Sequence, residues 1–201
     1  LGKNFIKKNE KWDIFALEHK NKIAVQKNLK IIRNDGSTFK DIFNYHNIDT
    51  VIHFASNYSY KEAPTIQKLD YKLEENLING SIESNVNKFI FAGSYFQDIF
   101  SEENSHYVIY KNNIEKRMIE VSNNSDVHFF SLHLGDIFGP NDFRNKLIPY
   151  LLKNENYPTV KINSDGKGAF SPIHIDDVLS HIINLEFTDK IFFETHNLYG
   201  K

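Results

Sequence analysis

The chain of 201 residues is 40% hydrophobic and 25% charged, so it is globular and can bury a core. A net charge of −2 without a long basic run gives no basis for binding nucleic acid, and the absence of cysteine excludes disulfides and cysteine-ligated metal sites. The apolar runs are far shorter than a membrane span and no signal peptide is recognisable, so we expect a soluble, cytoplasmic protein that does not associate with membranes.

Strands and helices are predicted to alternate along most of the chain. Residues 1–8 read as the first turns of a helix whose preceding strand is absent, and the chain does not begin with Met, so we expect a fragment of a longer polypeptide. Buried strands are predicted at 13–17, 29–33, 50–54, 89–92 and 126–134. Helices are predicted at 38–45, 65–83 and 106–121. This alternation indicates an α/β fold with a doubly wound parallel sheet.

The pattern loosens after residue 142. A helix is predicted at 147–152, a turn-rich loop at 163–168 and a second helix at 176–185. We therefore expect a small substrate-binding lobe over 143–201, interleaved with the last strands of the sheet and incomplete at its end.

A Tyr-x-x-x-Lys pair lies in the predicted helix 106–121. Tyr107 and Lys111 are four residues apart, so they share one helix face, and the ammonium lowers the pKa of the phenol toward neutral pH. Ser94 follows the strand 89–92, at the edge of a parallel sheet where ligands bind. The spacing alone is also typical of a surface helix. Tyr110 is a rival phenol, but its adjacency to Lys111 predicts that the two do not share a face.

The order of these motifs resembles the extended short-chain dehydrogenase/reductase family, in its branch of NAD-dependent nucleotide-sugar epimerases and dehydratases. Ser94, Tyr107 and Lys111 stand where that family has its catalytic Ser or Thr, Tyr and Lys, and Glu115 stands where an acid is often found. The resemblance covers nearly the whole chain. It implies an NAD(P)-binding Rossmann domain over 1–142, with the first strand and most of the glycine loop missing.

Motifs in the predicted substrate-binding part indicate which members of the family the chain resembles most. Segments 132–140 and 173–178 resemble the family's loop near nicotinamide and sugar and its late His-Val-x-Asp-Val signature. The family's dehydratases have an Asp-Glu pair after the catalytic Thr, whereas a Tyr-Phe pair follows Ser94, so elimination chemistry is not expected. The combination resembles sugar 4-ketoreductases of the CDP-abequose and CDP-paratose synthase type. The residues implied for substrate binding are Ser94, Tyr95, Asp136, Arg144 and Lys146.

The resemblance also implies the residues that bind the cofactor. Glu18 would accept hydrogen bonds from a ribose 2′-hydroxyl, which favours NAD, whereas His19 and Lys20 could bind the 2′-phosphate of NADP. The ketoreductase resemblance favours NADP, so the expectation leans slightly to NADP over NAD. The implied set is Gly2, Glu18, His19, Lys20, Asp35, His53, Phe54, Ala55, Ser56, Tyr107, Lys111 and Ile137.

The activity that the resemblance implies is hydride transfer at C4 of a nucleotide-linked deoxyhexose, as in a 4-ketoreductase of O-antigen or surface polysaccharide precursor synthesis. Tyr107 would donate a proton to the carbonyl oxygen, Lys111 would hold the nicotinamide ribose, and Ser94 would bond the same sugar oxygen. The alternatives are a 4-epimerase that retains NAD and a catalytically silent, cofactor-binding relative. A homodimer through helices 65–83 and 106–121 is expected by the same resemblance.

Two histidines and two aspartates are expected to have structural roles. His53 has no second ligand at metal-binding spacing, and His174 reads as a hydrogen-bonded residue rather than a base, so no metal site is expected. Asp176 and Asp177 are interpreted as the N-cap and a first-turn acid of a helix, because the helix dipole favours negative charge there.

Overall fold

The structure is a computed structural model. It describes residues 1–8, 11–18, 28–33, 36–55, 64–99, 106–162, 165, 167, 170–186 and 191–199. The predicted cofactor residues His19, Lys20, Asp35 and Ser56 lie outside these ranges, as does the side chain of Glu18.

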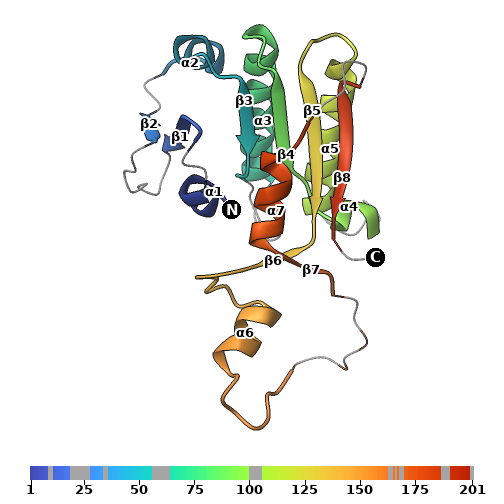
Figure 1. Ribbon diagram of the computed structural model, residues 1–201. Coiled ribbons are helices and arrows are strands. Elements are labelled where there is room, and N and C mark those ends of the chain that lie inside the picture. The colour runs from blue at the N-terminus through green and yellow to red at the C-terminus, as the bar shows by residue number, and fades with distance from the viewer. Residues whose placement is uncertain are drawn as a thin grey trace.

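A parallel sheet forms the centre of the molecule (Figure 1). Its four paired strands, in spatial order, are β3 (Thr50–His53), β4 (Lys88–Ala92), β5 (His128–Leu134) and β8 (Phe193–Leu198). Two further strands, β1 (Ile14–Glu18) and β2 (Leu29–Arg33), pair in parallel with each other as a separate sheet. The strand expected before residue 1 stays a prediction.

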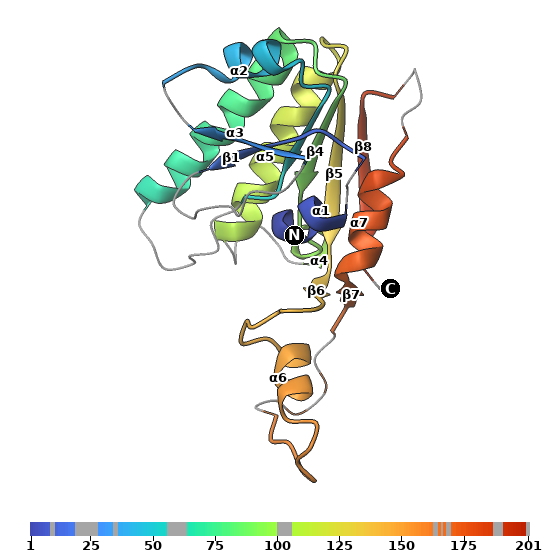
Figure 2. The ribbon, with the colours of Figure 1, turned by 60° about the vertical axis from the view of Figure 1, so that its left-hand side comes forward.

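Helices cover both faces of the four-stranded sheet (Figures 1 and 2). α3 (Pro64–Glu83) and α5 (His106–Ser122) lie on one face, and α1 (Gly2–Lys8) and α7 (Ile175–Ile183) lie on the other. α2 (Phe39–His46) packs against α3. This two-sided cover confirms the predicted α/β, doubly wound Rossmann architecture.

Side chains alternate between the two faces along each strand, because successive strand residues point to opposite sides of a sheet. On β4, Phe89 and Phe91 join the core beneath α3 and α5, whereas Ile90 and Ala92 join the core beneath α1 and α7. The first core also contains Ile42, Phe43, Val51, Leu77, Ile78, Val86, Tyr110, Ile114, Met118, Val127 and Phe129. The second contains Phe5, Phe130, Leu132, Leu134, Ile175, Val178, Leu179, Ile182 and Leu185.

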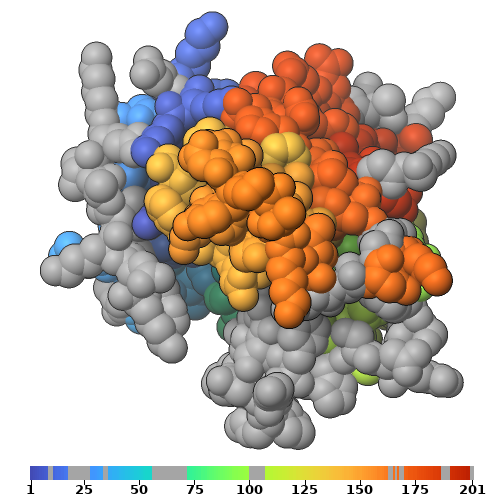
Figure 3. Space-filling view, turned by 90° about the horizontal axis from the view of Figure 1, so that it is seen from below, coloured from blue at the N-terminus to red at the C-terminus, as the bar shows by residue number. Residues whose placement is uncertain are grey.

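The chain leaves the sheet after β5 and later returns to it. β6 (Asp136–Phe138) pairs in parallel with β7 (Pro172–His174), and α6 (Leu147–Lys153) lies between them in sequence. α6 and the segments around it lie beyond the carboxyl ends of the strands, and Figure 3 shows them in the foreground of that end of the molecule. Whether residue 142 divides two domains stays a prediction.

Several elements differ from the sequence predictions. β6 and β7 were not predicted as strands, because each has only three residues and 136–138 was expected in a loop. β8 was not predicted, because four of its six residues are polar and it lies beyond the last predicted helix. α4 (Phe96–Ile99) is too short for a periodic pattern. The N-cap of α7 is His174, whose Nδ1 accepts the backbone N–H of Asp176 at 3.2 Å, so the prediction that an aspartate caps this helix is wrong.

Within the described ranges, no helix combines the length and apolar character that crossing a membrane requires.

Candidate active site

The face beneath α3 and α5 changes from apolar to polar toward the carboxyl ends of the strands. On β5, buried Phe129 is followed on the same face by Ser131 and His133, which both contact Glu115 of α5. On β3, buried Val51 is followed by His53, which contacts Glu74 of α3. Buried polar groups require hydrogen-bond partners. In this part of the sheet, side-chain hydrogen bonds therefore replace apolar packing.

Lys111 lies at the centre of this polar region. Its side chain is 1% exposed, and its Nζ donates a hydrogen bond to the Ala92 carbonyl at 2.5 Å and lies 4.4 Å from the ring centroid of Phe91. Burial lowers the pKa of the Lys111 ammonium from 10.5 to about 7, although the carboxylate of Glu74 acts to raise it. Lys111 therefore exchanges its proton near neutral pH.

The phenol of Tyr107 lies beside this ammonium. Tyr107 is 7% exposed, and the Nζ of Lys111 is 5.6 Å from its ring centroid. The helix α5 thus brings together Tyr107 and Lys111 as their spacing predicts.

Tyr110 also lies near the ammonium of Lys111, although the adjacency of the two residues predicts that they do not share a helix face. The Nζ of Lys111 is also 5.6 Å from the ring centroid of Tyr110, because the long lysine stem carries the ammonium away from the position of its own Cα. Tyr110 packs in the core with Ile114 and Met118. This packing gives Tyr110 a structural role.

Glu74 was not identified from the sequence. It is 1% exposed, and its Oε1 contacts Nε2 of His53, whose ring stacks on Phe91 at 6.0 Å between centroids. The signal was present, since Glu74 precedes the buried Leu77 and Ile78 by three and four residues and so lies on the same helix face. His53 is thus tied to an acid within the protein.

Ser94 follows the carboxyl end of β4, as predicted, and is 6% exposed. Its backbone N–H donates to Oε1 of Gln97 at 2.9 Å, and its Oγ accepts the backbone N–H of Phe96 at 3.3 Å. A Cβ at the preceding Gly93 would come within 2.9 Å of that Gln97 oxygen and 3.0 Å of His133 Cδ2. Only glycine therefore allows the turn, the amide and the imidazole to pack this closely.

An acid–imidazole–acid cluster lies against this turn. Nδ1 of His133 is 2.9 and 2.8 Å from the two carboxylate oxygens of Asp98, and its Nε2 is 2.9 Å from Oε2 of Glu115. Burial acts to lower the pKa of His133, but hydrogen bonds and charge from Glu115 and Asp98 raise it overall. Burial likewise acts to raise the pKa of Glu115, but hydrogen bonds from His133, Ser131 and Thr195 lower it overall. The sequence pointed to Glu115 only by resemblance and missed the other two members.

The predicted substrate residues fall into two groups. Tyr95 donates from its hydroxyl to Oδ2 of Asp136 at 3.0 Å, and Nζ of Lys146 lies 3.1 Å from Oδ1 of the same carboxylate. Arg144 instead pairs with Asp142 at 2.7 Å and donates to the Ile137 carbonyl at 2.6 Å. The structure therefore brings Tyr95, Asp136 and Lys146 together, whereas Arg144 binds its own loop.

The described residues of the predicted cofactor set are spread over several elements: His53 is on β3, Tyr107 and Lys111 are on α5, and Ile137 is on β6. Gly2 begins α1, and a Cβ there would be 3.9 Å from Cδ2 of Phe54, so α1 begins against the segment that follows β3. Ala55 is exposed beside Phe54, and Glu18 is the last residue of β1, paired with Arg33. Among the described residues, no cluster of three or more His, Cys, Asp or Glu is arranged to hold a metal ion.

Comparison with known proteins identifies a matching family and solved structures with the same fold. Residues 2–185 match the NAD dependent epimerase/dehydratase family. The CDP-abequose synthase of Salmonella typhimurium is 26% identical over 141 residues, which cover 67% of this chain and 47% of that protein. The CDP-abequose synthase of Salmonella muenchen is 26% identical over 149 residues, which cover 69% and 49%. The chain spans about half the length of these curated relatives.

Solved structures give the same fold. MoeE5 in complex with UDP-glucuronic acid and NAD has a TM-score of 0.80 at 17% identity, covering 98% of this chain and 72% of that one. The UDP-glucuronic acid 4-epimerase from Bacillus cereus, in complex with UDP-glucuronic acid and NAD, has a TM-score of 0.76 at 16% identity, covering 100% and 74%. At these identities the likeness shows the shared fold alone.

Proposed function

The chain belongs to the NAD dependent epimerase/dehydratase family, and from this premise we propose that the protein is an NAD(P)-dependent oxidoreductase acting on a nucleotide-linked deoxyhexose. The proposed reaction is hydride transfer at sugar C4, as a 4-ketoreductase in O-antigen or surface polysaccharide precursor synthesis. The observation that carries the proposal is the buried Lys111 ammonium, which lies 5.6 Å from the ring centroid of Tyr107 and donates to the carbonyl of Ala92, two residues before Ser94. The resemblance to two CDP-abequose synthases supports a reductase acting on a CDP-linked sugar.

In the proposed reaction, the phenol of Tyr107 donates a proton to the C4 carbonyl oxygen, and the hydroxyl of Ser94 donates a hydrogen bond to the same oxygen. The charge of Lys111 stabilises the phenolate that remains. The reduced nicotinamide supplies the hydride. Because the pKa of Lys111 is about 7, the lysine is charged in part at neutral pH and can return a proton to the phenolate.

The residues present fit a dinucleotide. Lys111 makes one hydrogen bond within the described part of the chain, which leaves two of its three donors for the vicinal hydroxyls of a ribose. The start of α1 lies against Phe54, in the segment that follows β3. We propose NADP, with NAD as the alternative, and the acid at Glu18 is the feature that favours NAD.

The Tyr95–Asp136–Lys146 group is proposed to bind the sugar. It presents a hydroxyl, a carboxylate and an ammonium, which are the groups that recognise sugar hydroxyls and a nucleotide diphosphate. Arg144 bonds Asp142 and the Ile137 carbonyl through Nε and Nη2, and its guanidinium has further N–H donors that could contact a diphosphate. Arg144 is therefore also proposed to bind the substrate.

The assay uses the full-length protein with CDP-, dTDP-, UDP- and GDP-linked 4-keto-deoxysugars and either NADPH or NADH, followed by absorbance of the reduced nicotinamide. Stoichiometric oxidation with one substrate is the expected result. Interconversion of a 4-hydroxy nucleotide sugar with catalytic NAD, without net oxidation, would instead establish the 4-epimerase. No turnover with bound cofactor would indicate the silent relative.

Tyr107→Phe tests the assignment of the proton donor, and Tyr110→Phe is its matched control. Both phenols are buried on α5 at the same distance from the lysine ammonium. Tyr107→Phe should lower kcat by about 10²- to 10⁴-fold, whereas Tyr110→Phe should retain most of the activity. Near-normal turnover of a folded Tyr107→Phe variant would show that the assignment is wrong.

We also propose a homodimer that buries the outer faces of α3 and α5. Leu73 and Ile119, which are 37% and 43% exposed, lie on these two helices. Sedimentation velocity should give a dimer, and Ile119→Glu should shift the protein toward the monomer.

A further inference from the structure

We propose that His133 is a positioning residue: held between Asp98 and Glu115, it fixes the Gln97 amide that binds the backbone of Ser94. The inference rests on the proposed function, since it concerns how the same site keeps its shape. His133 is 5% exposed and lies at the carboxyl end of β5, on the face covered by α5.

The contacts of His133 favour a proton on each ring nitrogen. Nδ1 faces the carboxylate of Asp98 at 2.8 Å, and Nε2 faces that of Glu115 at 2.9 Å. Ionised carboxylates only accept hydrogen bonds, and a neutral imidazole has one donor, so both contacts are satisfied together only by the imidazolium. His133 is therefore a buried cation between two acids.

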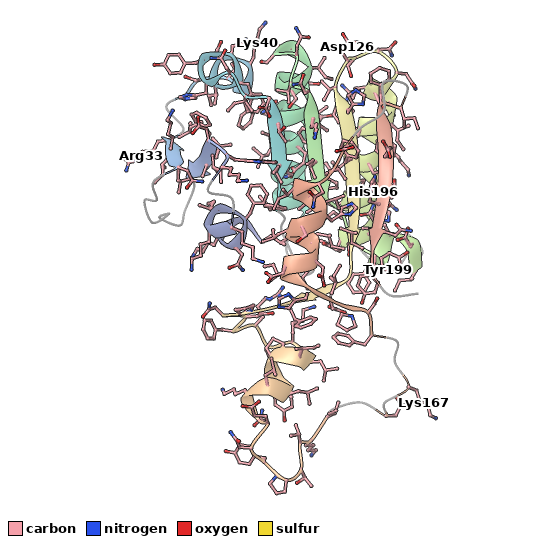
Figure 4. The ribbon with its side chains drawn as sticks, in the orientation of Figure 1. Arg33, Lys40, Asp126, Lys167, His196 and Tyr199 are labelled. Atoms are coloured by element: carbon pink, nitrogen blue, oxygen red, sulfur yellow. The ribbon has the colours of Figure 1, made fainter. Side chains whose placement is uncertain are left out.

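The charged groups around this cation come from three elements. Asp98 is on α4, Glu115 is on α5, and the hydroxyl of Tyr199, just after β8, donates to Oδ2 of Asp98 at 2.8 Å. Figure 4 shows Tyr199 at the carboxyl end of β8, beside α4. His133 on β5 thus contacts a carboxylate of α4 and a carboxylate of α5.

Gln97 transmits this arrangement to Ser94. Its Nε2 donates to Oε2 of Glu115 at 2.6 Å and to Oδ1 of Asn112 at 3.1 Å. Two acceptors on the nitrogen side turn Oε1 toward the backbone N–H of Ser94, which it accepts at 2.9 Å. If His133 loses a proton, one of the two carboxylates faces a lone pair of the ring and must move. If the carboxylate that moves is Glu115, Gln97 loses its hydrogen bond to it.

Glu115 has two further donors that do not reach Ser94. The hydroxyls of Ser131 and Thr195, from adjacent positions on β5 and β8, each donate to it at 3.1 Å. They hold the carboxylate from the strand side, and they do not titrate. The pH response of the Ser94 turn is thus assigned to His133.

An NMR titration tests the inference without any substrate. The ring resonances of His133 should titrate at a pH above that of an ordinary imidazole, and the backbone amide of Ser94 should shift with the same midpoint. His133→Gln should remove that shift, whereas His196→Gln should leave it intact, because His196 lies on β8 and contacts His181 of α7 on the opposite face. A Ser94 amide that ignores the His133 titration would overturn the proposal.

The kinetic test is a double-mutant cycle. With reductase activity established, His133→Gln should lower kcat on the order of 10- to 100-fold in the wild-type background but much less in Ser94→Ala, because it acts through Ser94. His133→Arg, which keeps the charge and two donors, should restore part of kcat. Equal losses in both backgrounds would mean that His133 is merely structural. If the protein is no reductase, the NMR outcome still decides the inference.

Gln97→Leu covers the case in which His133→Gln does not fold. This variant keeps the Asp98–His133–Glu115 cluster and removes only the amide. It should abolish the pH-linked shift of the Ser94 amide while His133 still titrates. A Ser94 amide that keeps shifting in Gln97→Leu would show that Gln97 is not the link.

Discussion

The two faces of the sheet are built from the same strands but differ at their carboxyl ends. Beneath α1 and α7 the packing stays apolar up to Leu134 and Ile175. Beneath α3 and α5 the apolar core gives way to His53, Ser131 and His133, each paired with a helix carboxylate. The face beneath α1 and α7 is thus held together by apolar packing, whereas the face beneath α3 and α5 also contains buried polar and charged groups next to the proposed catalytic residues.

The largest effect is expected at Lys111 on the polar face. Lys111→Met should lower the proposed reductase activity by about 10³-fold or more, because the reaction loses the charge beside the phenol. The same change should raise the free energy of unfolding at neutral pH, since burial disfavours the charged form of Lys111 and Met carries no charge. Activity assays and thermal unfolding of the same preparation check both signs.

A Lys111→Met protein that is both inactive and less stable would contradict this division of the two faces. It would mean that the hydrogen bond to the Ala92 carbonyl stabilises the sheet by more than the burial of the ammonium costs.

Leu132 tests the apolar face on the same strand. It is 0% exposed and packs in the core beneath α1 and α7. Leu132→Ala should lower the free energy of unfolding by about 2–5 kcal/mol, because it removes buried methyl groups and leaves a cavity. Denaturant unfolding measures the loss, and activity per folded molecule should stay near that of the wild type.

The sequence predicted the fold well where residues near one another carry the signal. The buried strand before Ser94 and the four-residue spacing of Tyr107 and Lys111 are local patterns, and the structure has both. The His133 cluster is different, because Asp98 and Glu115 are 35 and 18 positions away from it. Only the order of strands in the sheet brings them together, and a strand such as β8, with four consecutive polar residues, gives no strong periodic signal.

The charged groups on the polar face differ in how their contribution to the free energy of unfolding changes with pH. The pKa of His133 is raised by folding, so its contribution to stability is complete below about pH 6.5 and is lost as the pH rises through the folded value. The pKa of Glu115 is lowered, so its contribution is present above about pH 4.3 and is lost as the pH falls through the folded value. The two contributions overlap in the weakly acidic range.

Above neutral pH, the contribution of Lys111 to stability changes in the direction opposite to that of His133. Its folded pKa is about 7, whereas the unfolded chain holds the proton to about pH 10.4, so folding releases a proton and stability rises with pH between these values. In Lys111→Met this opposing slope is gone. Thermal unfolding of that variant should then show the alkaline loss of stability from His133, roughly 1.4 kcal/mol for each unit by which its pKa is raised. The loss should disappear in Lys111→Met/His133→Gln.

The smallest effect is expected one residue before Leu132. Ser131 is also 0% exposed, but its side chain faces α5 and donates to Glu115 at 3.1 Å. Ser131→Ala should cost only about 1 kcal/mol, because Glu115 keeps its bonds to His133, Gln97 and Thr195. Unlike Leu132→Ala, it should move the NMR titration midpoint of His133, since the lost hydrogen bond leaves more of the Glu115 charge for the imidazolium. If Ser131→Ala and Leu132→Ala gave equal losses and neither moved that midpoint, the two faces of β5 would not differ in the way the packing indicates.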